Sequence, residues 1–133
     1  MTKFKSILVI DDDDDYLYLV KQSLEKHDLF ETVQVMTNAN DGVNYIKENC
    51  NGEAVANCPD IIFLDNHMPG MDAVAFLDKM NEIGAIENNN LLIYLVSAFA
   101  SEKDLEMLKK YKIKGFINKP LTAEKVKALL VNA

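Results

Sequence analysis

The sequence predicts an α/β protein in which five strands alternate with five helices in a single domain spanning residues 1–133. Two observations support this fold class. Short, continuous apolar runs recur along the chain and are typical of strands that are covered on both faces. Between them, apolar residues recur at spacings of three and four, which indicate helices that face a sheet. This alternation implies right-handed crossovers and a doubly wound parallel sheet with helices on both of its faces.

The first apolar run, ILVI at Ile7–Ile10, predicts a buried strand. In the helix expected next, the apolar positions that should face the sheet are Tyr16, Leu17, Leu19, Val20 and Leu24. The β-branched residues of Thr32–Met36 favour a second strand, and Val43 and Ile46 belong to a second helical pattern. The polar, small-residue stretch Glu48–Pro59 predicts a long loop before the third strand.

The apolar runs Ile61–Leu64 and Leu91–Val96 predict the third and fourth strands, separated by the turn MPGM and a helix. Ser101 is expected to open the next helix, a brief fifth strand contains Phe116–Ile117, and Thr122 can cap the final helix. The apolar positions of these three helices are Val74, Phe76, Leu77 and Met80, then Leu105 and Leu108, then Val126, Leu129 and Leu130.

The formal net charge of −7 argues against a general affinity for nucleic acid, because such binding depends on neutralising phosphates. No apolar run approaches the roughly eighteen residues that cross a bilayer, and the chain meets aspartates too early to form a signal peptide. We therefore expect a soluble, cytoplasmic protein that binds no membrane.

Cys50 and Cys58 lack the spacing of a zinc site and are expected to be free thiols. The Lys-rich segment from Phe99 onward indicates either a solvated helix face or a docking surface.

Five consecutive aspartates follow the first strand in the stretch ILVIDDDDDY. Ligands of an open parallel sheet bind beyond the carboxyl ends of its strands, so Asp11, Asp12 and Asp65 are expected at one edge. Three carboxylates there fit a hard divalent cation, Mg²⁺ above all. Residues 13–15 lie where the first helix should begin, and acids in that turn favour the helix dipole. The alternative is that the whole run serves helix capping and solubility alone.

Two further strand ends bring polar groups to the same edge. Ser97 follows the fourth strand, and Lys119 follows the fifth in the sequence NKP. A metal with carboxylates, a hydroxyl donor and an ammonium around one cavity could stabilise a phosphoryl group during its transfer. Taken singly, Ser97 can also be a capping hydroxyl and Lys119 a surface cation. A calcium-binding loop is disfavoured, because Tyr16 stands where glycine is required and Gln22 where glutamate is required.

The chain resembles the receiver domain of two-component response regulators, of the stand-alone, CheY-like chemotaxis-regulator type. Four motifs carry the resemblance, in order along nearly the whole chain: ILVIDD, IIFLDNHMPGMDA, YLVSA and GFINKP. The resemblance implies the flavodoxin-like receiver fold, with five parallel strands in the order 2-1-3-4-5 and no output domain. It also implies a signalling protein and not an enzyme: a phosphoacceptor that assists its own phosphoryl transfer and dephosphorylation.

The resemblance implies that Asp65 accepts a phosphoryl group from a histidine kinase or phosphotransfer protein and becomes an aspartyl phosphate. Asp12 and Asp65 would hold Mg²⁺ directly, Asp11 would hold it largely through water, and the backbone carbonyl of His67 would be a further ligand. Ser97 would donate a hydrogen bond to one phosphoryl oxygen.

In the same family pattern, Lys119 pairs with another phosphoryl oxygen, and the Lys119–Pro120 bond has the position of a cis peptide. Phe116 is the switching aromatic ring, which turns inward when Ser97 moves toward the phosphoryl group. Phosphorylation would shift the population toward an active form with an altered surface on the last two helices and the fifth strand. An unknown downstream protein would bind there, or the phosphoryl group would pass along a relay. The residues expected to border this output surface are Tyr111, Lys112, Lys114 and Asn118.

Two positions depart from the family pattern, because Ala73 stands where glycine is usual and His67 where Asn or Arg is usual. Two other functions compete. A Mg²⁺-dependent phosphatase or phosphotransferase for small molecules is disfavoured, because His67 replaces the second Asp of such enzymes and no segment could form a cap. A receiver-like module that never carries phosphate is disfavoured by the intact set of Asp65, Ser97 and Lys119. We expect a monomer or a weak dimer.

Overall fold

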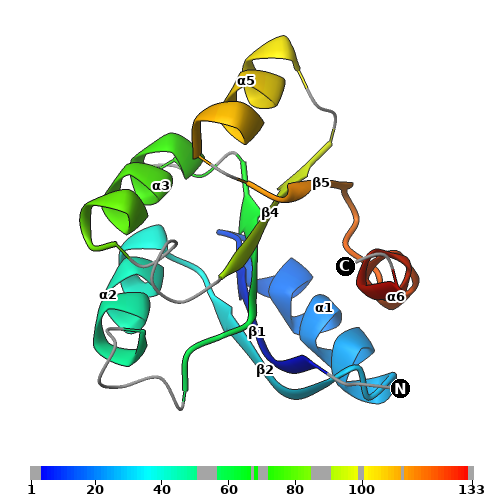
Figure 1. The fold of residues 1–133 in the computed structure, drawn as a ribbon. Helices are drawn as coiled ribbons and strands as arrows, with labels where there is room; N and C mark the ends of the chain where they lie inside the picture. Colours follow the sequence, from blue (N-terminus) through cyan, green and yellow to red (C-terminus); the bar gives the residue numbers. More distant parts are fainter. Residues whose placement is uncertain are drawn as a thin grey trace.

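Strands and helices alternate along the chain in the computed structural model, which describes residues 4–50, 57–66, 68, 72–84, 91–98, 101–111 and 113–131 (Figure 1). The strands of this part are β1 (Phe4–Ile10), β2 (Phe30–Met36), β3 (Ile61–Asp65), β4 (Leu92–Ser97) and β5 (Gly115–Asn118). Its helices are α1 (Asp14–Lys26), α2 (Ala39–Asn49), α3 (Ala73–Glu82), α5 (Glu102–Tyr111) and α6 (Ala123–Val131). None of these helices is both long and apolar enough to cross a lipid bilayer.

All five strands form one parallel sheet in the order β2-β1-β3-β4-β5, so the predicted fold class and strand order are confirmed. The register pairs Ile10 with Leu64 and Ser97 with Asn118. Strands β1, β3, β4 and β5 therefore end close to one another at a single edge of the sheet. Any polar side chain that directly follows one of these ends is held near the others by the backbone ladder.

Helices cover both faces of the sheet, with α1 and α6 on one face and α2, α3 and α5 on the other (Figure 1). Residues of α1 and α6 that are buried against the first face are Leu17, Val20, Leu24, Ala123 and Val126. Residues buried against the second face include Val43, Ile46, Phe76, Leu77 and Met80. The final helix begins as predicted, because the Thr122 hydroxyl accepts a hydrogen bond from the Lys125 backbone N–H at 3.2 Å.

The prediction that Leu19 faces the sheet is wrong, because its side chain is 63% exposed. Leu17 and Val20 lie three residues apart and share the buried face of α1. With about 3.6 residues per turn, the position between them that follows Leu17 by two lies on roughly the opposite side of the helix. Apolar character alone did not reveal which of these leucines is buried.

The prediction of free cysteines is also wrong, because Cys50 and Cys58 form a disulfide across the connection between α2 and β3. Cys50 follows the last residue of α2, and Cys58 lies shortly before β3. The chain turns back here to begin the next strand, which brings the two Cα atoms to 5.0 Å, within bridging distance. The spacing in the sequence does not show this return.

Helix α2 packs tightly on the sheet at Gly42. A Cβ atom added there would lie 2.6 Å from Cδ1 of Ile10 and 3.3 Å from Cε2 of Phe76, and both of those side chains are fully buried. We expect Gly42→Ala to lower the free energy of unfolding by about 1 kcal/mol, because overpacking outweighs the gain in helix propensity. In an Ile10→Val background, which lacks Cδ1, the same substitution should be neutral or stabilising. Urea unfolding of the four proteins tests this, and an equal effect in both backgrounds would refute it.

Candidate functional site

Three aspartate side chains lie together at the carboxyl edge of the sheet. Asp11 and Asp12 directly follow β1, and Asp65 is the last residue of β3. One carboxylate oxygen from each residue lies within 4.8 Å of the others. Asp11 and Asp65 are only 2% and 3% exposed, whereas Asp12 is exposed. The cluster is therefore enclosed by protein around two carboxylates and open to solvent at the third.

The remaining aspartates of the run start helix α1. Asp13 is the N-cap, and its side chain accepts a hydrogen bond from the Tyr16 backbone N–H at 3.1 Å. Asp14 and Asp15 lie in the first turn, where negative charge favours the helix dipole. The Asp13 backbone N–H in turn donates to Oδ1 of Asp11 at 3.0 Å. The backbone at the helix start therefore holds one oxygen of Asp11 in place. Residues 11 and 12 belong to the acidic cluster, whereas residues 13–15 stabilise the start of α1.

Lys119 supplies a positive charge to this cluster. Its Nζ lies 3.1 Å from Oδ2 of Asp11 and 3.3 Å from Oδ1 of Asp65. Burial by itself lowers the pKa of Lys119, but the hydrogen bonds and charges of Asp11 and Asp65 outweigh burial and raise this pKa above its usual 10.5. The backbone N–H of Lys119 donates to the Ser97 carbonyl at 2.9 Å, which ties the end of β5 to the end of β4.

The structure places the other predicted site residues as follows. Ser97 ends β4 and is 3% exposed, and the partly buried Phe116 of β5 packs against the α2, α3 and α5 side of the core. The Lys119–Pro120 peptide bond is cis. Ala73 is the first residue of α3 and is buried. His67 lies outside the described residues.

One residue of this site was not singled out from the sequence. Tyr16 was predicted only as an apolar position of the first helix, yet its hydroxyl accepts a hydrogen bond from the Leu121 backbone N–H at 2.7 Å. The Nζ of Lys119 lies 5.2 Å from the centre of its ring. A signal was available, because Tyr16 lies in the first turn of the helix that begins just after Asp12 and so near the same edge of the sheet.

The output surface predicted from the sequence is only partly exposed. Tyr111 is 3% exposed, so its assignment to this surface is wrong. Its hydroxyl donates to Oδ1 of Asp78 on α3 at 2.7 Å. This hydrogen bond is the main cause of the raised pKa of Tyr111, and burial is the second. Lys114 and Asn118 are exposed as expected, and Lys112 lies outside the described residues.

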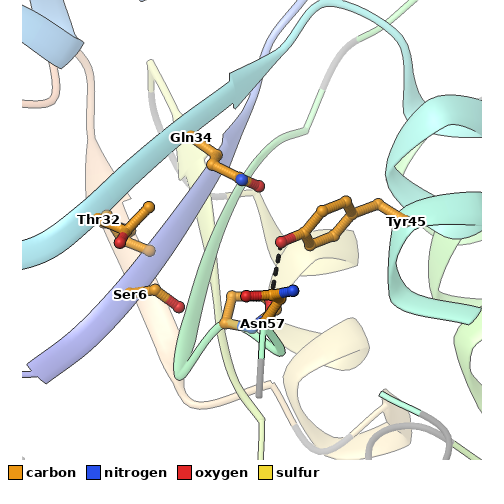
Figure 2. A pocket seen from close by; sticks show the side chains of 7 residues that line it. Ser6, Thr32, Gln34, Tyr45 and Asn57 are labelled. Atoms are coloured by element: carbon orange, nitrogen blue, oxygen red, sulfur yellow. Dashed lines mark hydrogen bonds between the residues drawn. The ribbon is translucent and has the colours of Figure 1, made fainter. Parts of the chain in front are cut away.

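A polar cavity of about 100 Å³ lies elsewhere in the fold (Figure 2). It is lined by Ser6, Ile7, Thr32, Gln34, Tyr45, Asn57 and Pro59. The Tyr45 hydroxyl donates to the Asn57 carbonyl at 2.8 Å across it. Because Ser6 lies in the first half of β1 and Pro59 precedes β3, this cavity lies toward the opposite end of these strands from the acidic cluster. It therefore forms no part of the candidate site.

The family model described as the response regulator receiver domain matches residues 7–131. The chain is similar to a solved two-component response regulator from Cytophaga hutchinsonii, with 26% identity, a TM-score of 0.83 and coverage of 98% of this chain and 97% of that chain. A comparison with curated proteins gave no match.

More distant solved structures share the fold. Chemotaxis protein CheY4 of Vibrio cholerae is 17% identical, with a TM-score of 0.76 and coverage of 97% of this chain and 98% of that chain. A CheY-like receiver domain protein from Methanospirillum hungatei JF-1 is 20% identical, with a TM-score of 0.76 and coverage of 98% and 93%. The family match spans nearly the whole sequence and includes each strand end at which the acidic cluster and Lys119 lie. The chain belongs to the response regulator receiver domain family.

Proposed function

We propose that this protein is a phosphorylation switch in which Asp65 accepts a phosphoryl group from a histidine kinase or a histidine phosphotransfer protein. The single observation that carries the proposal is the position of the Asp65 carboxylate. It is nearly buried, it lies within 4.8 Å of the carboxylates of Asp11 and Asp12, and it is paired with Lys119 at 3.3 Å. Family membership adds the expectation of a signalling role.

Three carboxylates from two adjacent strands are the kind of donor set that Mg²⁺ binds, since this ion prefers oxygen ligands and retains several waters. Asp12 and Asp65 would bind it directly, and Asp11 largely through water. The bound ion would supply positive charge that neutralises the phosphoryl oxygens. The exposure of Asp12 leaves this side of the cluster open to the donor protein.

In the proposed reaction, a carboxylate oxygen of Asp65 attacks the phosphorus atom of a phosphohistidine. An O–P bond forms, the N–P bond breaks, and its electron pair returns to the imidazole nitrogen of the donor. Lys119 follows the phosphoryl group from its present position against Asp65 and neutralises one of its oxygens. The Ser97 hydroxyl donates a hydrogen bond to another oxygen of the phosphoryl group. Attack by water on the same phosphorus later returns the free carboxylate and inorganic phosphate.

The covalent phosphate would then shift the population of conformations. Movement of Ser97 toward the phosphoryl group leaves space that the ring of Phe116 fills, and both residues lie on adjacent strands β4 and β5. The surface of α5, β5 and α6 changes with them, and the exposed Lys114 and Asn118 border it. A downstream protein binds this surface in the phosphorylated state. We propose that this phosphorylation and partner binding take place in the cytoplasm and that the protein is a monomer or a weak dimer.

The test is intact-mass analysis after incubation with Mg²⁺ and acetyl phosphate. The natural sequence should gain one phosphoryl group, and Asp65→Asn should gain none. Asp13→Asn is the matched control and should retain the adduct, because Asp13 caps α1 and Asn also caps helices well. An undiminished adduct in Asp65→Asn would refute the proposal. Failure of the natural sequence to react with acetyl phosphate, phosphoramidate and beryllofluoride alike would also refute it, and rapid hydrolysis of many phosphate esters would favour a phosphatase.

Mg²⁺ should stabilise the folded protein through the same carboxylates. At ten times its dissociation constant, a ligand specific for the folded state adds about 1.4 kcal/mol to the free energy of unfolding. We expect this gain in thermal unfolding with Mg²⁺ against EDTA, and expect Asp12→Asn to remove most of it. Asp15→Asn changes an exposed acid outside the cluster and should keep the gain. Equal Mg²⁺ shifts in all three proteins would show that the ion binds elsewhere.

A further inference from the structure

Tyr16 contacts the segment that carries Lys119 at two points. Its ring lies beside the ammonium group, with 5.2 Å between Nζ of Lys119 and the ring centre. Its hydroxyl accepts the hydrogen bond from the Leu121 backbone N–H at 2.7 Å. The two residues contacted are separated only by Pro120, so one side chain of α1 holds the segment on both sides of the cis bond.

Other contacts hold the same segment from β4 and from α6. The Lys119 backbone N–H donates to the Ser97 carbonyl at 2.9 Å. The Lys125 ammonium on α6 donates to the carbonyls of Asn118 and Pro120, each at 3.0 Å. These bonds come from β4 and from the helix that follows the segment. The bond from Tyr16 differs because it comes from α1, whose first turn directly follows Asp11 and Asp12.

We propose that Tyr16 is a positioning residue for phosphoryl transfer at Asp65, acting by holding the Lys119 ammonium toward the carboxylates of Asp11 and Asp65. The inference rests on the proposed function, because it assigns a role in that same reaction. In this proposal Tyr16 acts on the reaction through Lys119, which it contacts with its ring, and through the Leu121 backbone N–H, from which its hydroxyl accepts a hydrogen bond.

Each of the two contacts has a separate physical effect. Leu121 is 4% exposed, so loss of the hydroxyl would leave its backbone N–H short of a partner and allow the segment to shift. The face of the aromatic ring attracts the ammonium and covers one side of it, which limits the solvent that competes for its charge. Transfer depends on positioning and charge neutralisation, so a small displacement of Lys119 lowers the rate.

Two substitutions separate these effects. Tyr16→Phe retains the ring and removes the hydroxyl, so the maximal rate of Asp65 phosphorylation should fall about twofold to tenfold, as for one lost hydrogen bond. Tyr16→Leu also removes the ring and should cost about another twofold to fivefold. Tyr18 on the same helix is 61% exposed and provides matched controls. Tyr18→Phe and Tyr18→Leu should keep the natural rate.

A double-mutant cycle distinguishes positioning from a general structural role. The rate at saturating acetyl phosphate is measured for the natural sequence, Tyr16→Phe, Lys119→Met and the double variant. If Tyr16 acts through Lys119, its substitution has no further effect once the ammonium is gone. The half-saturating Mg²⁺ concentration should change little in Tyr16→Phe, and the ¹H–¹⁵N signal of Leu121 should shift upfield with the loss of its acceptor.

Each outcome has a defined meaning. Equal fold losses from Tyr16→Phe with and without Lys119 would overturn the inference and leave the proposed function intact. Phosphorylation rates equal to that of the natural sequence in both Tyr16→Phe and Tyr16→Leu would also overturn the inference and leave the proposed function intact. If the natural sequence forms no adduct and binds no beryllofluoride, the proposed function fails, and the role of Tyr16 fails with it. Because Tyr16→Phe is nearly isosteric, its thermal midpoint and amide spectrum show whether a rate loss comes from unfolding.

Discussion

Replacing Lys119 with Met is expected to slow phosphorylation of Asp65 by about 100-fold to 1,000-fold, the usual cost of removing one preorganised group that stabilises developing charge. Nζ of Lys119 already lies 3.3 Å from the oxygen of Asp65, so little movement is needed to follow the phosphoryl group. Met retains much of the apolar stem and removes the charge. Rates at saturating acetyl phosphate and Mg²⁺ test the expectation, with Lys114→Met as a control because Lys114 is exposed and precedes β5.

The same variant should be less stable when Mg²⁺ is absent. Asp11 and Asp65 are almost fully buried and would lose their positive partner. The side chain of Lys119 is 34% exposed, so the loss should be about 1–2 kcal/mol, below the 3–5 kcal/mol found when a fully buried pair is broken. Mg²⁺ should restore part of this stability. A variant with the natural rate and the natural Mg²⁺-free stability would contradict both the site and its electrostatics.

The sign of the pH dependence follows from the pKa of Lys119. Because the folded-state pKa lies above the usual 10.5, the stabilisation from this ammonium is present below pH 10.5. It is lost as the pH rises through the higher folded-state value. Lys119→Met should therefore lose less stability than the natural sequence when the pH is raised above 10.5, and urea unfolding across that range measures the difference.

Reduction of the Cys50–Cys58 disulfide should lower the free energy of unfolding by about 2–3 kcal/mol, the chain-entropy effect of opening a loop of this size. The bond fixes the segment before β3 close to the end of α2. Hydrogen bonds hold the same segment to its neighbours, since the Tyr45 hydroxyl donates to the Asn57 carbonyl at 2.8 Å and the Ser6 N–H donates to Asp60 at 3.1 Å. Because these bonds survive reduction, we expect a less stable protein with an intact fold.

Urea unfolding with and without dithiothreitol measures this loss. A double Cys50→Ala, Cys58→Ala variant is the control and should be insensitive to dithiothreitol. The acidic cluster lies at the other end of β3 from Cys58, so reduction should leave the rate of Asp65 phosphorylation nearly unchanged. Disulfides are uncommon in the reducing cytoplasm, so the redox state of this pair in cells also tests the location that we propose. Identical unfolding curves for the oxidised and reduced protein would contradict the predicted contribution.

Much of the fold could be predicted because strands β1, β3 and β4 are short, largely buried and nearly continuous in apolar residues. The runs at Ile7–Ile10 and Ile61–Leu64 have the length and apolar content of covered strands, and their carboxyl ends bring the following aspartates to one edge. Lys119 could be placed by the same reasoning, because it follows a strand in the same sheet. The end of a strand can be recognised from the local sequence, and the parallel arrangement of the strands brings their carboxyl ends to the same edge.

Features that depend on contacts between distant segments could not be predicted in this way. Tyr16 and Leu121 are hydrogen-bonded across 105 positions, and no periodicity records that contact. Leu19 and the ring of Tyr111 are both large and apolar, yet Leu19 is exposed on α1 and Tyr111 is buried, with its hydroxyl bonded to Asp78 of α3. The Cys50–Cys58 disulfide depends on how the chain returns from α2 to β3. In each case the packing of one element on another decided the outcome.

A crystal structure of the protein with Mg²⁺ and beryllofluoride tests the central claim most directly. The claim is that the acids of β1 and β3 share one Mg²⁺ beside Lys119 so that Asp65 can carry a phosphoryl group. We predict the beryllofluoride group on the carboxylate of Asp65, with Mg²⁺ about 2.0–2.1 Å from oxygens of Asp12 and Asp65. Lys119 should contact a fluorine atom. Beryllofluoride bound elsewhere, or an Asp65 that carries it with no Mg²⁺ near Asp12, would contradict the account.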